Sequence, residues 1–146
     1  MVNVANLLES KDGVVWSIHP EVSVFKALQY MAEKEVGALM VMEETRLVGI
    51  LSERDYARKV ALKERSSHTT LVKDIMTANV KFVSPEHSIE ACMNLMTQLH
   101  CRHLPVIKDN QVIGMVTLGD VVKQIIAEQK HKISELENNI TWGESY

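Results

Sequence analysis

The chain has 146 residues, a hydrophobic fraction of 46% and a formal net charge of −3, an ordinary globular balance. A length of this order builds one ordinary domain or two very small ones. The weakly acidic charge, with no basic tract, argues against a nucleic-acid partner or an anionic membrane surface. No apolar run approaches the roughly 18 residues of a membrane span. Because its two cysteines show no metal spacing, we expect a reduced, cytoplasmic setting.

In chain order, the first half predicts a strand, a helix, two strands and a second helix. Residues 14–18 form the first short strand, and Ser23 is a good helix N-cap. Apolar residues follow it at helical spacing, at Val24, Ala27, Leu28 and Met31. Residues 38–42 and 47–51 are apolar runs of strand length with a polar turn between them, which predicts a hairpin. The second helix is expected to begin at Ser52.

The second half repeats this pattern at a shift of 65 residues, without a gap from residues 18–60 to residues 83–125. Pairs that coincide include Pro20 with Pro85, Gly49 with Gly114, and Asp55 with Asp120. Residues 4–8 match residues 72–76 at a shift of 68, so the first copy carries three extra residues near position 12. A repeat of this kind decides the fold, because one copy alone buries too little apolar surface.

The predicted fold class is α/β, with two β-α-β-β-α repeats packed through their sheets as a pseudo-twofold pair. The expected ranges are a first repeat over 1–62, a polar linker over 63–70, a second repeat over 71–127, and a C-terminal helical extension and tail over 128–146. The last helix is expected to follow from Thr117 and to extend over residues 122 to about 136 as an amphipathic tail, with residues 141–146 as a loop.

The sharpest motif is Gly49-Ile50-Leu51-Ser52-Glu53-Arg54-Asp55, which recurs as Gly114-Met115-Val116-Thr117-Leu118-Gly119-Asp120. One interpretation is a capping box, in which the hydroxyl and the acid satisfy free N–H groups at a helix start. The other is ligand binding, with the hydroxyl on a phosphate oxygen and the acid accepting hydrogen bonds from a ribose. The two interpretations are compatible, since a capping hydroxyl can also contact a ligand.

Two further segments complete a pattern that resembles a known family. They are Val72-Lys73-Asp74-Ile75-Met76-Thr77 and Arg102-His103-Leu104-Pro105-Val106. With the repeated motif, they resemble the CBS domain, named after cystathionine β-synthase, over residues 1–127. Residues 51–60 also resemble small stand-alone CBS-pair proteins. The resemblance implies two clefts between the repeats that bind AMP, ADP, ATP, S-adenosylmethionine or NAD-type nucleotides.

The resemblance also implies roles for the motif residues. Asp55 and Asp120 would hold the ribose, while Ser52 and Thr117 would meet a phosphate. His19, beside a proline before the first helix, is a further candidate for lining a cleft, with a surface turn as the alternative.

Basic residues distinguish the two copies. Arg102 and His103 stand just before a strand of the second copy, where nucleotide-binding members of the family carry basic groups that face phosphates. Gly37 and Ala38 occupy the equivalent positions of the first copy. We therefore expect unequal clefts, with the tighter one built by Thr117 and Asp120 beside Arg102. Arg54, inside the first motif, either reaches a phosphate across the pseudo-twofold axis or stays solvated.

The predicted function is a non-catalytic regulatory module that binds an adenosine-containing nucleotide, with AMP, ADP or ATP as first choice and NAD(H) as second. The alternative is a structural dimerisation or adaptor module without a nucleotide. A third hypothesis, an enzyme, has no support from nucleophile, Walker or metalloprotease motifs. We expect a homodimer and a regulated protein partner of unknown identity, with no prosthetic group, metal, nucleic acid or membrane partner.

Overall fold

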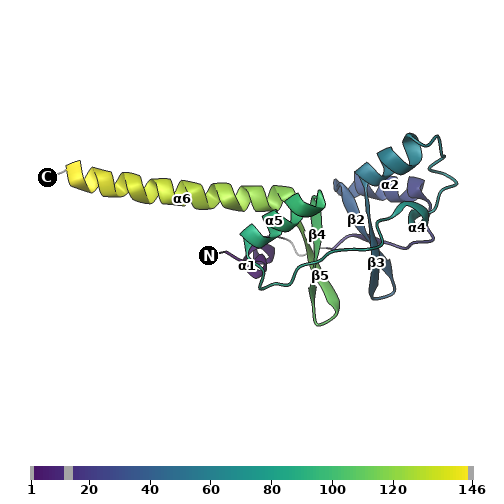
Figure 1. Cartoon of the computed structure of the whole chain (residues 1–146), viewed down its shortest axis with the longest axis horizontal. Helices are drawn as coiled ribbons and strands as arrows, with labels where there is room; N and C mark the ends of the chain where they lie inside the picture. Colours follow the sequence, from purple (N-terminus) through teal and green to yellow (C-terminus); the bar gives the residue numbers. More distant parts are fainter. Residues whose placement is uncertain (1, 12–14, 145–146) are drawn as a thin grey trace.

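The computed structural model of the chain describes residues 2–11 and 15–144, and the side chains among them as far as residue 138. Its elements, in order, are α1 (Val4–Glu9), β1 (Ser17–Ile18), α2 (Val24–Lys34), β2 (Ala38–Glu43), β3 (Arg46–Ser52), α3 (Glu53–Tyr56), the π-helical turn η1 (Ala57–Ala61), α4 (Val72–Ile75), α5 (Ile89–Leu99), β4 (His103–Lys108), β5 (Gln111–Thr117) and α6 (Leu118–Glu144). The hairpins β2–β3 and β4–β5 lie side by side at the centre, each with its own helices, and α6 projects outward (Figure 1). The α/β class and the repeated architecture are as predicted.

The backbone repeats as closely as the sequence does. Ser23 and Ser88 cap α2 and α5, and their Oγ atoms accept hydrogen bonds from Lys26 N at 3.2 Å and Ala91 N at 3.0 Å. The two helices end at Glu35 and His100, both in the left-handed region with φ of 55° and 53°. The predicted N-cap at Ser23 is confirmed, and the shift of 65 residues extends to the helix ends.

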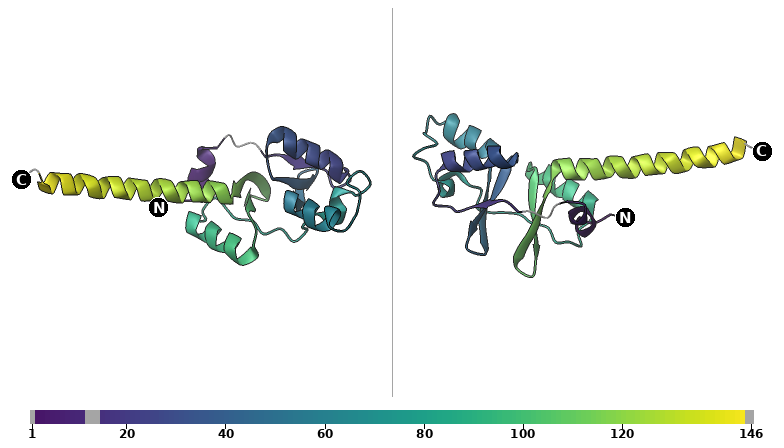
Figure 2. Two further views of the ribbon diagram at one scale, coloured as in Figure 1. Left: turned by 90° about the horizontal axis from the view of Figure 1, so that it is seen from above. Right: turned by 180° about the vertical axis from the view of Figure 1, so that it is seen from behind.

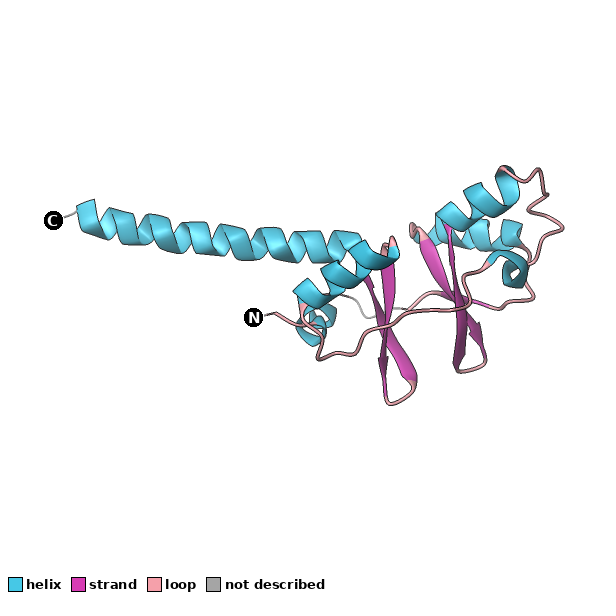
Figure 3. Cartoon of the chain, viewed as in Figure 1, coloured by secondary structure: helices cyan, strands magenta, loops and turns pink. Residues whose placement is uncertain are grey.

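Each copy contains a small sheet (Figure 3). In the first copy, β1 pairs parallel with β2, and β2 pairs antiparallel with β3. In the second copy, β4 pairs antiparallel with β5, and an isolated parallel bridge from Val83 to Val106 stands in the place of β1. The expected strand over residues 14–18 is shorter in the structure, because only Ser17 and Ile18 pair with β2. Its first residue, 14, lies outside the described residues.

The molecule has two hydrophobic cores, and each core contains one short helix from the other copy. Val4 and Leu7 of α1 are buried in the core of α5, β4 and β5, whereas Val72 and Ile75 of α4 are buried in the core of α2, β2 and β3. Backbone hydrogen bonds fasten both helices, from Val4 N to His87 O and from Val72 N to Val22 O, each at 2.9 Å. The packed lobes therefore do not coincide with the sequence repeats, a crossing that repeat boundaries alone do not reveal.

The motif glycines leave room for these crossing segments. A Cβ atom on Gly49 would lie 2.6 Å from Met76 Sδ and 2.9 Å from the carbonyl oxygen of Thr77. A Cβ atom on Gly114 would lie 2.7 Å from a terminal methyl group of Leu8. The glycine that opens each motif is thus explained by packing.

The last helix is longer than the sequence predicts. We expected a loop over residues 141–146, but α6 continues through Glu144, and residues 145–146 lie outside the described part of the chain. No proline interrupts it, and Thr141 and Trp142 are only weakly unfavourable in a helix. Seen from above and from behind, α6 extends well beyond the two lobes (Figure 2). Among the described residues, no helix combines the length and apolar character needed to cross a membrane.

Candidate ligand cavities between the repeats

Both motifs form reciprocal capping boxes where a strand turns into a helix. Asp55 N donates to Ser52 Oγ at 3.1 Å, and Ser52 N donates to Asp55 Oδ2 at 2.9 Å. The second copy has the same pair, since Asp120 N donates to Thr117 Oγ1 at 3.1 Å and Thr117 N donates to Asp120 Oδ2 at 2.9 Å. The capping interpretation is confirmed, and each acid still has acceptor capacity to spare.

The first cavity, of about 660 Å³, opens beside Ser52 and Asp55 and takes its walls from both copies. Its cationic lining residues are Arg54, Arg58, Lys81 and Arg102, and its acids are Glu53 and Asp55. Apolar lining comes from Ile50, Val80 and Leu99. Its volume lies within the range of small-molecule pockets, about 300–1,000 Å³. Four cationic side chains therefore outnumber the two carboxylates in a space that a nucleotide could fill.

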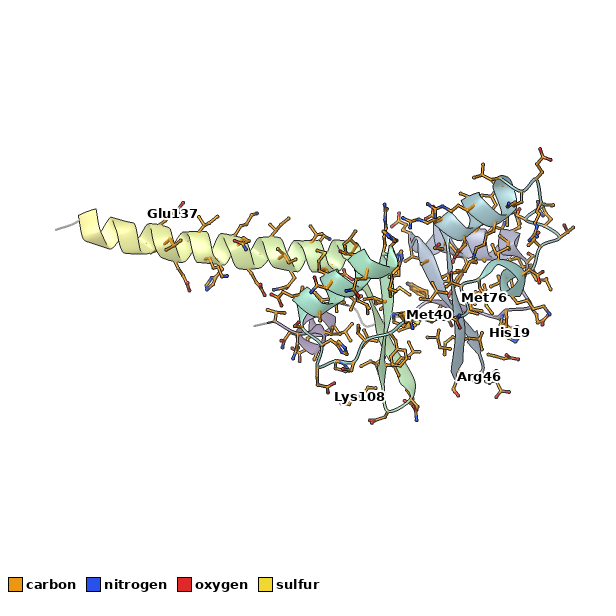
Figure 4. All side chains as sticks on the ribbon, viewed as in Figure 1. His19, Met40, Arg46, Met76, Lys108 and Glu137 are labelled. Carbon is orange, nitrogen blue, oxygen red and sulfur yellow. The ribbon has the colours of Figure 1, made fainter. Side chains whose placement is uncertain are left out.

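The second cavity, of about 520 Å³, lies beside Thr117 and is differently lined. Its walls carry Trp16, Met40 and Met115, with the two lysines Lys11 and Lys34. Met40 lies between the two lobes (Figure 4). Asp120 is not among the lining residues.

Arg102 lies in the opposite cavity from the one expected. It lines the first cavity with Ser52 and Asp55 of the other copy, whereas its neighbour His103 lines both cavities, as Gly37 does. In each copy, the residue just before the hairpin accepts a hydrogen bond from the start of the helix that follows the hairpin. Leu118 N donates to Arg102 O at 2.9 Å, and in the first copy Glu53 N donates to Gly37 O at 3.0 Å. The cavities, however, form between copies, so Arg102 faces the other motif. Reasoning within one repeat cannot show this exchange.

His103 is largely buried between the copies. Burial, together with the neighbouring Arg102 charge, holds the pKa of His103 below its ordinary value of 6.5. The imidazole is therefore mainly neutral at pH 7 and can contribute a hydrogen bond but little charge.

Arg54 spans the boundary between the copies. Its Nη1 donates to the backbone oxygen of His100 at 3.0 Å, and the residue lines the first cavity. His19 is exposed, accepts a hydrogen bond from Glu21 N on Nδ1 at 3.1 Å, and lines neither cavity. Figure 4 places His19 in the lobe that contains β2 and β3.

Four cationic lining residues were not predicted from the sequence: Arg58, Lys81, Lys11 and Lys34. Arg58 follows Arg54 by four residues, a spacing that places both on one helix face and could have revealed it. Lys81 and Lys11 come from connecting segments outside the motif, where no sequence signal marks them.

Two α/β repeats with exchanged helices, and ligand-sized cavities between them, define a paired-repeat module. A family model described as CBS domain matches residues 11–62 and 72–127, and the chain belongs to this family as a tandem CBS pair.

Similar proteins cover most of the chain. The "CBS domain-containing protein CBSX3, mitochondrial" of Arabidopsis thaliana is 43% identical over 126 residues, which are 83% of this chain and 61% of that protein. The chain thus spans less than two thirds of that relative. A protein with CBS domains from Burkholderia ambifaria MC40-6 has a solved structure with 44% identity and a TM-score of 0.85, matched over 88% of this chain and 96% of its own. A CBS domain pair solved with 5′-methylthioadenosine and S-adenosyl-L-methionine shares the fold with a TM-score of 0.75 at 23% identity, over 87% of this chain and 98% of its own.

Proposed function

We propose that this CBS pair is a non-catalytic sensor that binds one adenosine-containing nucleotide in the first cavity. The observation that carries the proposal is the gathering of Arg54, Arg58, Lys81 and Arg102 around the cavity that Asp55 lines. Arginine binds phosphate through a planar fork of donors, and several cations in one cavity favour an anionic ligand.

The roles follow from charge and free acceptors. Asp55 Oδ2 accepts from Ser52 N at 2.9 Å, and its side chain is only 13% exposed. A carboxylate offers about four acceptor positions. Ser52 N, Ser52 Oγ and Lys59 Nζ use three of them, which leaves Asp55 one for a ribose hydroxyl. Arg102 and Arg54 would hold the phosphate with Lys81 and Arg58, and the apolar lining would cover the base. AMP, ADP or ATP is the first choice, and NAD(H) the second.

The regulatory part of the proposal rests on the walls of the cavity. Because both copies line it, a bound nucleotide would contact both and favour the arrangement that fits it best. Such a ligand shifts an equilibrium without being transformed, and a protein partner would respond to that shift. The adenosine ligands of the distant CBS pair belong to that protein, and they support only the choice of ligand class.

A thermal-shift screen tests the ligand class. Adenosine, AMP, ADP, ATP, NAD, NADH and S-adenosylmethionine would each be added to the whole chain. A nucleotide present at about 100 times its Kd should stabilise the folded state by about 2.7 kcal/mol. Stabilisation by phosphorylated adenosines but not by adenosine alone at equal concentration supports a cationic phosphate site. No stabilisation by any of the seven compounds contradicts the proposal.

A second candidate function, self-association, is favoured by α6. Beyond the lobes its large apolar residues stay exposed, with Ile126 at 48%, Ile133 at 52% and Leu136 at 61%. Ile126 and Ile133 are seven residues apart, and Leu136 follows three later, the spacing of a coiled-coil seam. We therefore propose a homodimer in which two α6 helices pair. This role is compatible with nucleotide binding.

Location is proposed separately. We propose a cytoplasmic, reducing setting, which is supported by the free thiols of Cys92 and Cys101. The Arabidopsis relative is named as mitochondrial, a label that belongs to that protein.

A further inference from the structure

We propose that Lys11 is a built-in plug of the second cavity, which occupies the ribose-binding carboxylate of Asp120 and limits this CBS pair to one nucleotide. The inference deepens the proposed function and rests on it for the role of the motif acid. Lys11 lies outside both motifs.

The contacts of Lys11 carry the proposal. Its Nζ donates to Asp120 Oδ2 at 2.6 Å and to the carbonyl oxygen of Met115 at 2.8 Å. The same Oδ2 also accepts from Thr117 N at 2.9 Å. The side chains of Lys11 and Asp120 are 33% and 20% exposed, so the ion pair is partly shielded from water. A short charge-assisted bond of this kind is stronger than the bond a neutral ribose hydroxyl would make.

The first copy shows what the unplugged arrangement looks like. Asp55 also has a lysine, Lys59, whose Nζ lies 3.2 Å from Oδ1. Lys59 does not line the first cavity, whereas Asp55 does. In the second copy the order is reversed, because Lys11 lines the cavity and Asp120 does not. The acid therefore lines the cavity in the first copy, whereas its lysine partner lines the cavity in the second.

The two motifs differ in the segment that packs beside them, and this explains why the lysines are placed differently. In the first motif, Ile50 exchanges backbone hydrogen bonds with Thr77, at 3.0 Å and 2.9 Å. In the second motif, the equivalent residue Met115 gives its carbonyl oxygen to the Lys11 side chain instead. At the shift of 68 residues, Lys11 aligns with Asn79, which is shorter and uncharged. A longer cationic side chain thus takes the place of a backbone pairing.

The other lysine of the second cavity has its own partners. Lys34 Nζ lies 4.5 Å from the centroid of the Trp16 ring and 3.5 Å from Glu33 Oε1. These partners do not include Asp120, so Lys34→Met removes the same charge from the same cavity and leaves the plug in place. This variant is the matched control.

The test is the number of AMP molecules bound per chain, measured by equilibrium dialysis and calorimetry on the full chain. We expect one for the wild type, two for Lys11→Met, and one again for Lys11→Met combined with Asp120→Ala. Lys34→Met should stay at one. Lys11→Met and Lys11→Gln both remove the lysine charge and are called the opening variants. Lys11→Gln replaces Lys11→Met if a melting curve shows that Lys11→Met does not fold.

Each outcome decides the proposal. A gain of one AMP on opening, lost again with Asp120→Ala, supports it. Two AMP molecules on the wild type, or no gain in either opening variant, overturns it. If the wild type binds none and Lys11→Met binds one, the proposed role of the first cavity fails while the plug stands.

Discussion

Arg102 is the residue whose role can be tested most selectively. In the first cavity it faces the motif of the other copy, so Arg102→Ala should weaken AMP binding and leave adenosine binding nearly unchanged. Loss of one charged hydrogen-bonding partner should cost about 1.5–3 kcal/mol, roughly a ten- to hundredfold rise in Kd. Calorimetry with both ligands checks this. Lys108→Ala, at the exposed end of β4, the strand that follows Arg102, is the control. Equal AMP affinity in the wild type and Arg102→Ala would contradict the assignment.

His103 predicts a pH dependence of stability. Its pKa lies below the ordinary value of 6.5 because it is buried beside Arg102. The unfolded chain therefore binds this proton more tightly, and stability should fall as pH drops from about 6.5 towards the folded pKa. Urea unfolding at pH 7.5 and pH 5.5 should show a smaller loss in His103→Gln than in the wild type. His19→Gln, an exposed histidine, should keep the wild-type loss. An identical loss in His103→Gln would rule this out.

At the scale of elements, the exchanged helix α1 predicts which lobe a mutation destabilises. A mutation in α1 should destabilise the lobe of α5, β4 and β5. Leu7, 4% exposed, is buried in the core of α5 and β4. Leu7→Ala should cost about 2–5 kcal/mol of unfolding free energy. Hydrogen exchange should show the lost protection in α5, β4 and β5, although Leu7 belongs to the first half of the chain. Glu9→Ala, on the exposed side of α1, is the control. Protection lost first in α2 and β2 would mean that the exchange of helices is absent.

The two motif glycines, Gly49 and Gly114, should differ in how much stability a change to alanine costs. Gly49→Ala would bring a Cβ atom 2.9 Å from a backbone oxygen, that of Thr77, which cannot easily move. Gly114→Ala would meet only the end of the Leu8 side chain, which can change rotamer. Thermal denaturation should therefore show a larger loss for Gly49→Ala. The reverse order would contradict the packing of α4 against β3.

Local patterns in the sequence were sufficient for the longer helices and the hairpins of each repeat, but not for the short helices α1 and α4 or the full length of α6. The Ser23 cap, the hairpins and the boxes at Ser52 and Thr117 depend on neighbours within a few residues, and all were predicted. The position of Arg102 depends on which copies meet across the pseudo-twofold axis, and that was predicted wrongly. The role of Lys11 depends on contacts with Met115 and Asp120, which are 104 and 109 residues away in the sequence. The sequence alone did not reveal which residues far apart in the chain contact each other.

For the whole molecule, the extended helix predicts a dimer that can be separated from ligand binding. Ile133→Glu places a charge on the exposed apolar seam of α6 and should shift light-scattering mass from dimer to monomer at micromolar concentration. Ser134→Glu, next along the helix and off the seam, should remain dimeric. A wild-type chain that is monomeric, or an Ile133→Glu chain that stays dimeric, would show that α6 is not the interface.

The nucleotide site that we propose for this CBS pair is the first cavity and not the second. Calorimetric titration of AMP into the wild type, Asp55→Ala and Asp120→Ala tests it most directly. Asp55 lines the basic cavity, whereas Asp120 is held by Lys11 at 2.6 Å. We therefore predict that Asp55→Ala abolishes or strongly weakens binding, while Asp120→Ala binds AMP as the wild type does. Loss of binding in Asp120→Ala with full binding in Asp55→Ala would contradict the account.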